Sequence, residues 1–129
     1  MILQYIQPSD VKQYWFQIKP SLNDMANQTG EWIVEDAYVD LITGKAQLYL
    51  AIENSYFQGY FITQVIGNTL HIWAVYGENT NLFEEGMEAI KQLANKQNLT
   101  KITFSSVRKG WERIAPKLGF KPKMWVYEC

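Results

Sequence analysis

The sequence has one cysteine and one histidine among its 129 residues. One cysteine excludes an intramolecular disulfide, and one of each excludes a zinc site made from both types. No apolar run approaches the roughly 18–20 residues that a membrane span needs, and Met1–Tyr5 lack the features of a secretory signal. The net charge of −1 gives no general reason to expect nucleic acid or an anionic membrane as a partner. We therefore expect a cytoplasmic protein.

The residues that are present favour one folded domain over residues 1–129. Hydrophobic residues make up 47%, aromatic residues 15% and charged residues 19%, a composition that excludes a disordered or fibrous chain. At this length, folding buries roughly two-thirds of the surface of the unfolded chain, which allows a core without metals or disulfides. No internal repeat or Pro/Gly/Ser-rich linker divides the sequence.

The first long segment predicts a helix that Ser9 or Asp10 caps. Its apolar stripe consists of Val11, Trp15, Ile18, Leu22 and Met25. Pro20 interrupts this stripe without changing its phase, so we expect one kinked helix or two stacked pieces. After Gly30, a second and shorter helix is predicted around Val34–Leu41.

The middle of the chain predicts an antiparallel meander. Strands are expected over residues 46–53, 56–66 and 69–76, and Gly67-Asn68 forms a tight turn between the last two. A short strand at Ile2–Tyr5 can precede them.

The remaining elements alternate between helix and strand. Asn81 and Glu84 form a capping-box pattern that opens a helix ending near Asn98. A strand over Lys101–Ser105, a helix over Lys109–Leu118 and a final strand over Lys123–Glu128 follow. Because a helix separates strand 69–76 from strand 101–105, these two strands should be parallel. The fold class is therefore α/β (α+β) with a mixed sheet.

This order of elements, with Arg108-Lys109-Gly110-Trp111 and Leu118-Gly119-Phe120, resembles the GNAT N-acetyltransferase superfamily, in particular the small GNAT-like proteins of tailed phages. The resemblance implies a mostly antiparallel, twisted sheet with helices on both faces. It also implies an acetyl-CoA-dependent N-acyltransferase that needs no metal, in the host cytoplasm or in a virion.

The resemblance further implies where acetyl-CoA would bind. Backbone groups around Ala74 and Val75 would meet the pantetheine and the thioester carbonyl. The following loop, Gly77 with Asn79, Thr80 and Asn81, would direct N–H groups at the pyrophosphate. That loop departs from the family pattern because it has a single glycine and no basic residue. The nearby acids Glu78, Glu84 and Glu85 oppose a phosphate.

Four side chains are candidates for catalysis or binding. His71 suits a general base because a neutral imidazole can deprotonate an ammonium near pH 7. Glu53 is a second candidate base, and Tyr76 is a candidate acid for a departing thiolate. Arg108 precedes a predicted helix, where its charge opposes the helix dipole, so it is a candidate anion ligand. Packing in an aromatic core is the alternative for His71 and Tyr76.

Charge is distributed unevenly along the chain. Residues 101–129 carry seven basic and two acidic residues, a net charge of +5 that leaves −6 for residues 1–100. Three functions stay open: an acyltransferase acting on a small-molecule or protein amine, a degenerate GNAT-fold module that binds a protein partner, and nucleic-acid binding through the basic third. The module would be virion-associated, accessory or an antagonist of a host function. An exposed edge of the last strand can also support a homodimer.

Overall fold

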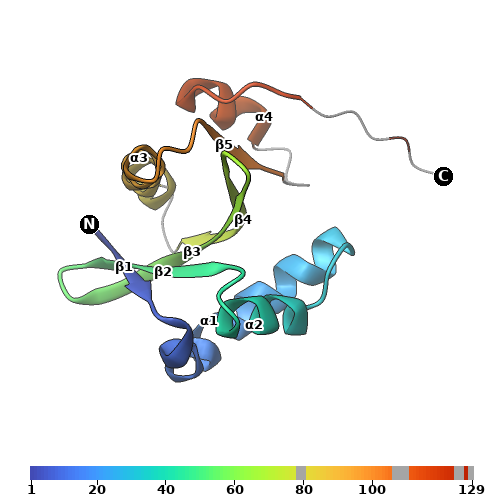
Figure 1. Cartoon of the computed structure of the whole chain (residues 1–129), viewed down its shortest axis with the longest axis vertical. Coiled ribbons are helices and arrows are strands. Elements are labelled where there is room, and N and C mark those ends of the chain that lie inside the picture. Colours follow the sequence, from blue (N-terminus) through green and yellow to red (C-terminus); the bar gives the residue numbers. More distant parts are fainter. Residues whose placement is uncertain (78–80, 106–110, 124–126, 128–129) are drawn as a thin grey trace.

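The structure is a computed structural model that describes residues 1–77, 81–105, 111–123 and 127. Within these residues a five-stranded sheet lies between two groups of helices (Figure 1). The strands are β1 (Ile2–Ile6), β2 (Gln47–Glu53), β3 (Tyr56–Ile66), β4 (Thr69–Gly77) and β5 (Lys101–Phe104). The helices are α1 (Val11–Thr29), α2 (Val34–Ile42), α3 (Asn81–Lys96) and α4 (Trp111–Ile114), with 3-10 turns at Pro8–Asp10 and Ala115–Leu118.

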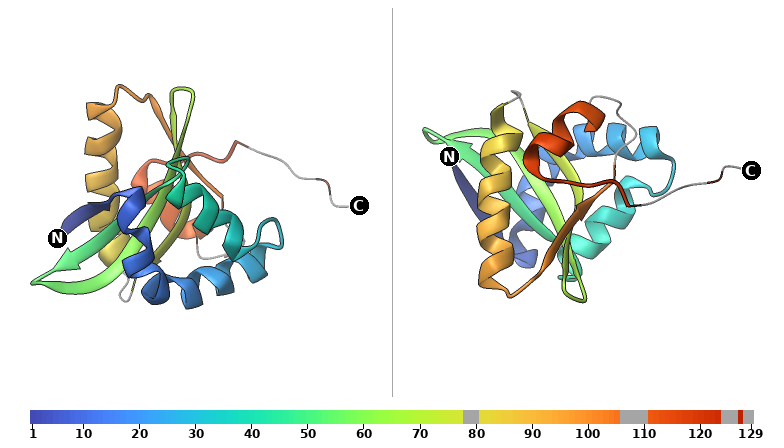
Figure 2. Two further views of the ribbon diagram at one scale, coloured as in Figure 1. Left: turned by 60° about the horizontal axis from the view of Figure 1, so that its bottom comes forward. Right: turned by 90° about the horizontal axis from the view of Figure 1, so that it is seen from above.

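The strands lie side by side in the order in which they occur in the sequence. Strands β1 to β4 pair antiparallel, and β4 pairs with β5 in parallel, from Thr69 opposite Lys101 to Ile72 opposite Phe104. The predicted meander, the Gly67-Asn68 turn and the parallel pair are therefore confirmed. With α1 and α2 on one face and α3 on the other (Figure 2), the predicted fold class is confirmed as well.

Helix α1 is a single helix with Pro20 inside it. Asp10 takes the N-cap position but makes no side-chain capping hydrogen bond, so the expected cap is wrong in that respect. The preceding 3-10 turn begins the helix instead. Beside Pro20, the Tyr60 hydroxyl from β3 lies 2.6 Å from Ser21 Oγ and donates to the Ile18 carbonyl at 3.4 Å. These bonds tie the helix to the sheet where proline removes a backbone donor.

The core has one apolar cluster on each face of the sheet. Ile18 and Leu22 of α1 and Leu41 of α2 are buried on the first face. On the second face, Met87 and Ile90 of α3 pack on Phe61, Leu70 and Ile72. In the part of the chain that the structure describes, no helix is both long and apolar enough to span a membrane.

The C-terminal part differs from the prediction. The helix expected over Lys109–Leu118 is α-helical at Trp111–Ile114 and then narrows to a 3-10 turn. Pro116 has no N–H to continue the α-helical bonding, which explains the change. Most of the expected final strand, residues 123–128, lies outside the described residues, and Lys123 itself lies in no strand.

Candidate active site

The pairing of β4 with β5 covers only the first half of β4. Their ladder ends with Ile72 opposite Phe104, but β4 continues through Trp73, Ala74, Val75 and Tyr76 to Gly77. Its pairing with β3 shifts at this point, since Ile62 faces Ala74 whereas Thr63 faces Ile72. Trp73 is therefore a bulge residue, and a bulge bends its strand. Beyond Ile72, one backbone edge of β4 has no neighbouring strand among the described residues.

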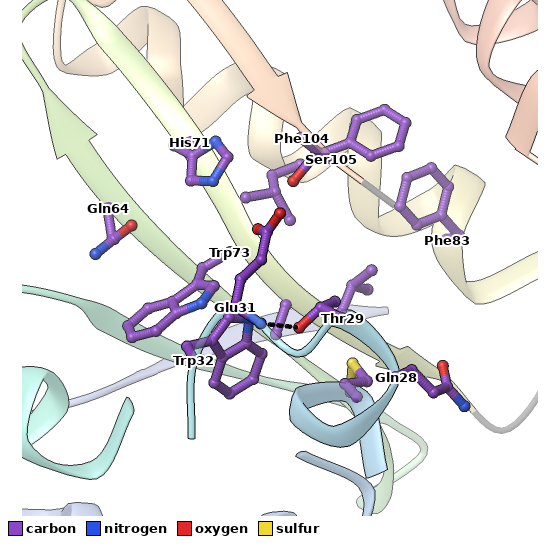
Figure 3. Close-up of a pocket in the computed structure, with 14 residues that line it drawn as sticks. Gln28, Thr29, Glu31, Trp32, Gln64, His71, Trp73, Phe83, Phe104 and Ser105 are labelled. Carbon is purple, nitrogen blue, oxygen red and sulfur yellow. Dashed lines mark hydrogen bonds between the residues drawn. The ribbon is translucent and has the colours of Figure 1, made fainter. Parts of the chain in front are cut away.

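A cavity of about 220 Å³ lies where the strands separate. Strands β4 and β5 form one wall, and Phe83 of α3 lies at one end (Figure 3). The C-terminal end of α1 and the connection to α2 form the opposite wall. The polar side chains in the lining are Gln28, Thr29, Glu31, Gln64, His71 and Ser105. The edge of β4 that has no partner strand among the described residues thus borders a space with polar groups.

His71 lines this cavity from β4. Its Nδ1 lies 2.9 Å from the Thr103 hydroxyl on β5, so a hydrogen bond joins the two strands next to the end of their ladder. Burial lowers the pKa of the imidazole below its ordinary value, because burial penalises the charged form. His71 is therefore neutral at pH 7, as a proton acceptor must be.

Glu31 is a lining residue that the sequence analysis did not single out. Its carboxylate extends into the cavity in the direction of His71 and Ser105 (Figure 3). Beside it, Trp32 packs edge-to-face on Trp73 of β4 with ring centroids 5.2 Å apart. A carboxylate thus adjoins two half-buried indoles at the α1–α2 wall.

The connection that carries Glu31 and Trp32 is fixed at both ends. Gly30 adopts a left-handed conformation, φ 68°, and its N–H donates to the Ala26 carbonyl at 2.9 Å, which closes α1. At the start of α2, the Ile33 N–H donates to Asp36 Oδ2 at 3.1 Å. The two residues between these caps are consequently held against the cavity by local bonds.

The other predicted residues lie in several places. Ala74 and Val75 line the cavity, whereas Tyr76 stacks on Tyr60 at a centroid distance of 5.7 Å and is not in the lining. Glu53 pairs with Tyr56 at the β2–β3 hairpin, separated from β4 by β3.

The remaining predictions concern the loop after β4 and the approach to α4. Gly77 ends β4, opposite Gly59. Asn79, Thr80 and Arg108 lie outside the described residues. Asn81 is the first residue of α3, and Glu84 and Glu85 in that part of the helix are exposed.

Comparison with known proteins finds similar structures but no similar sequence. No family model matches the chain, and no curated protein sequence matches it. Solved structures match over essentially its full length. A probable acetyltransferase aligns with TM-score 0.73 and 11% identity, covering 100% of this chain and 97% of that one. The ribosomal-protein-alanine N-acetyltransferase of Brucella melitensis biovar Abortus aligns with TM-score 0.69 and 12% identity, covering 100% and 98%.

A third similar structure is an aminoglycoside acetyltransferase from an uncultured soil metagenomic sample, in complex with sisomicin. It aligns with TM-score 0.66 and 10% identity, covering 99% of this chain and 93% of that chain. At such identities the likeness shows the fold, and the chain has the fold of the GNAT acetyltransferases.

The residues present fit one end of acetyl-CoA, the co-substrate that this fold implies. A pantetheine arm carries amides that need backbone partners, and the unpaired edge of β4 offers such groups beside a cavity. The sequence from Gly77 to Asn81, which joins β4 to α3, contains no basic residue. Among the described residues, no group of three His, Cys, Asp or Glu side chains is placed to hold a metal.

Proposed function

We propose that the protein is an acetyl-CoA-dependent N-acyltransferase that acts on an amine. The observation that carries the proposal is the separation of β4 from β5 beyond Ile72, which leaves the backbone around Ala74 and Val75 facing the cavity. Backbone groups held in a strand are already oriented, and such preorganised donors stabilise a developing charge efficiently.

Bound acetyl-CoA would supply an acetyl thioester, whose C–S bond breaks as the amine nitrogen forms the amide C–N bond. An ammonium loses two protons on becoming a secondary amide. His71 accepts the first proton and passes it to solvent, and the second ends on the departing sulfur. If the imidazole Nδ1–H donates to Thr103, Nε2 carries the lone pair that accepts the proton.

Thiol release from acetyl-CoA, measured with a panel of primary amines, tests this proposal. We expect release that depends on an amine, and His71→Asn should slow it by about 10²-fold or more, the contribution of a positioned base. Lys101→Gln, which changes an exposed residue of β5 outside the cavity, should leave the rate unchanged. Absence of amine-dependent thiol release from the whole panel would contradict the proposal.

One observation favours a second candidate, a GNAT-fold binding module without catalysis. Glu84 and Glu85 are exposed near the start of α3, where carboxylates compete with a phosphate for the free N–H groups. Such a module would bind neither acetyl-CoA nor an amine selectively, and its ligand would be a protein. A phage origin, suggested by Arg108-Lys109-Gly110-Trp111, stays a prediction, as does a cytoplasmic or virion location.

A further inference from the structure

We infer that the α1–α2 wall of the cavity is the acceptor site, and that it selects a small monoamine with an apolar body. In this arrangement Glu31 binds the ammonium group, and Trp32 and Trp73 contact the apolar body. The inference rests on the proposed function, because it identifies the class of acceptor for the same site.

Charge is the first argument. Among the described residues that line the cavity, Glu31 is the only one with a formal charge at neutral pH, since His71 is neutral. Helix α1 ends at this wall, and its last turn contains no basic residue. The negative end of the helix dipole therefore adds to the carboxylate and favours a cation.

Glu31 is an exposed residue that directly follows the C-terminal end of α1 and its Gly30 cap. An acidic residue directly after a helix C-terminus opposes the dipole. Its backbone N–H contacts Thr29 Oγ1 at 3.5 Å, but this contact would form with any residue at the position. The carboxylate itself extends into the cavity (Figure 3). Because the residue is exposed, a cation that enters the cavity from solvent can reach this carboxylate.

The two indoles define the rest of the acceptor. Trp32 and Trp73 are half-buried and touch edge-to-face, so together they offer a continuous apolar surface beside the carboxylate. Indole rings attract cations and pack well against flat apolar groups. An amine whose carbon skeleton lies on this surface would direct its nitrogen toward Glu31.

Size and charge together disfavour large polycations. A cavity of about 220 Å³ is smaller than the roughly 300–1,000 Å³ of pockets for drug-sized ligands, and the acetyl group must share it. A second ammonium group would find no second carboxylate in the described lining, so it would gain no further ion pair there. The site should therefore prefer a small monoamine to a polyamine or an aminoglycoside.

Calorimetric titration of the full chain without acetyl-CoA tests the inference. The probes are 2-phenylethylammonium, its uncharged analogue 2-phenylethanol, and spermidine. We expect the monoamine to bind at least about tenfold more tightly than either of the others. Glu31→Gln should remove about tenfold of that affinity, as expected for loss of a charged hydrogen bond. Glu35→Gln changes an exposed acid of α2 outside the cavity and should bind like the wild type.

A second variant tests the apolar wall separately. Trp32→Leu should weaken binding of 2-phenylethylammonium more than binding of ethylammonium, which lacks the ring, while circular dichroism confirms folding. The inference is overturned if wild-type protein shows no millimolar affinity for the monoamine. Equal affinity for the alcohol, a preference for spermidine, or unchanged binding by Glu31→Gln would overturn it as well.

These titrations, together with the thiol-release assay, distinguish this inference from the proposed function. Selective monoamine binding without acetyl transfer would contradict the proposed function and leave the acceptor site intact. Acetyl transfer to amines at a rate that Glu31→Gln does not change would contradict the acceptor site and leave the enzyme intact.

Discussion

His71 Nδ1 lies 2.9 Å from Thr103 Oγ1, one residue before the last pair of the β4–β5 ladder. The bond therefore joins the two strands at the point where they begin to separate. It also fixes the orientation of the single imidazole in the cavity. Both effects hold the imidazole of His71 at a fixed position relative to the backbone of β4 beyond Ile72.

Thr103→Val should impair catalysis with little effect on the fold, because valine keeps the shape of threonine and removes only the hydroxyl. A positioned base contributes about 10²–10⁴-fold to a rate, so loss of its orientation should lower kcat/KM at least about tenfold. The acidic limb of the pH–rate profile, where protonation of His71 abolishes its action as a base, should also move. Thr103→Ser retains the hydroxyl and should behave like the wild type. An unchanged profile for Thr103→Val would show that the bond does not position the base.

His71 should also make folding stability depend on pH. Burial lowers the pKa of the folded-state imidazole below its ordinary value of about 6.5, so the unfolded chain binds the proton at a higher pH than the folded protein. The contribution of the neutral His71 to the free energy of unfolding is present above the ordinary value of about 6.5. It is lost as the pH falls toward the folded-state pKa. Urea unfolding below pH 6.5 should show a loss that His71→Asn reduces. Equal pH dependence in both proteins would contradict the prediction.

Gly86 allows α3 to lie close to the sheet. A Cβ at this position would lie 2.5 Å from two ring atoms of the fully buried Phe61. Overpacking costs about 1–3 kcal/mol, whereas alanine gains about 1 kcal/mol over glycine in a helix. Gly86→Ala should therefore lower stability by about 1 kcal/mol, or Tm by about 4 °C. Glu88→Ala, an exposed site on the same helix, is the control, and a higher Tm for Gly86→Ala would show that the ring can move aside.

Tyr60→Phe should destabilise the protein through α1. It removes the hydroxyl that contacts Ser21 and the Ile18 carbonyl, a loss of about 1 kcal/mol. Burial raises the pKa of Tyr60, so its contribution is present below pH 10, the ordinary tyrosine value, and is lost at more alkaline pH. The wild type should thus lose more stability above pH 10 than the variant. Parallel alkaline unfolding curves would contradict this assignment.

Much of the fold could be predicted from the sequence, because local signals agree with the tertiary arrangement. The Gly67-Asn68 turn and the apolar stripe of α3 each identify an element directly. The connection through α3 also determines the parallel pairing of β4 with β5. The change from α-helix to 3-10 turn at Ala115 was missed, although Pro116 carried a signal for it.

The site could be predicted only in part. His71, Ala74 and Val75, which a resemblance in element order singled out on β4, line the cavity, and their roles stay predictions. Glu31 was missed because one acid between two helices shows no periodicity, and its orientation depends on the caps at Gly30 and Ile33. The separation of the strands was not predictable from residue patterns, because it depends on the early end of β5 and the bulge at Trp73.

The most direct test of the account is binding of acetyl-CoA, followed by amide chemical shifts in ¹⁵N-labelled protein. The account predicts micromolar affinity, with the largest amide shifts at Ala74 and Val75 on the free edge of β4 and small shifts on β1 and β2. The central claim is contradicted if no shift occurs at millimolar acetyl-CoA, or if the shifts fall on strands remote from the cavity.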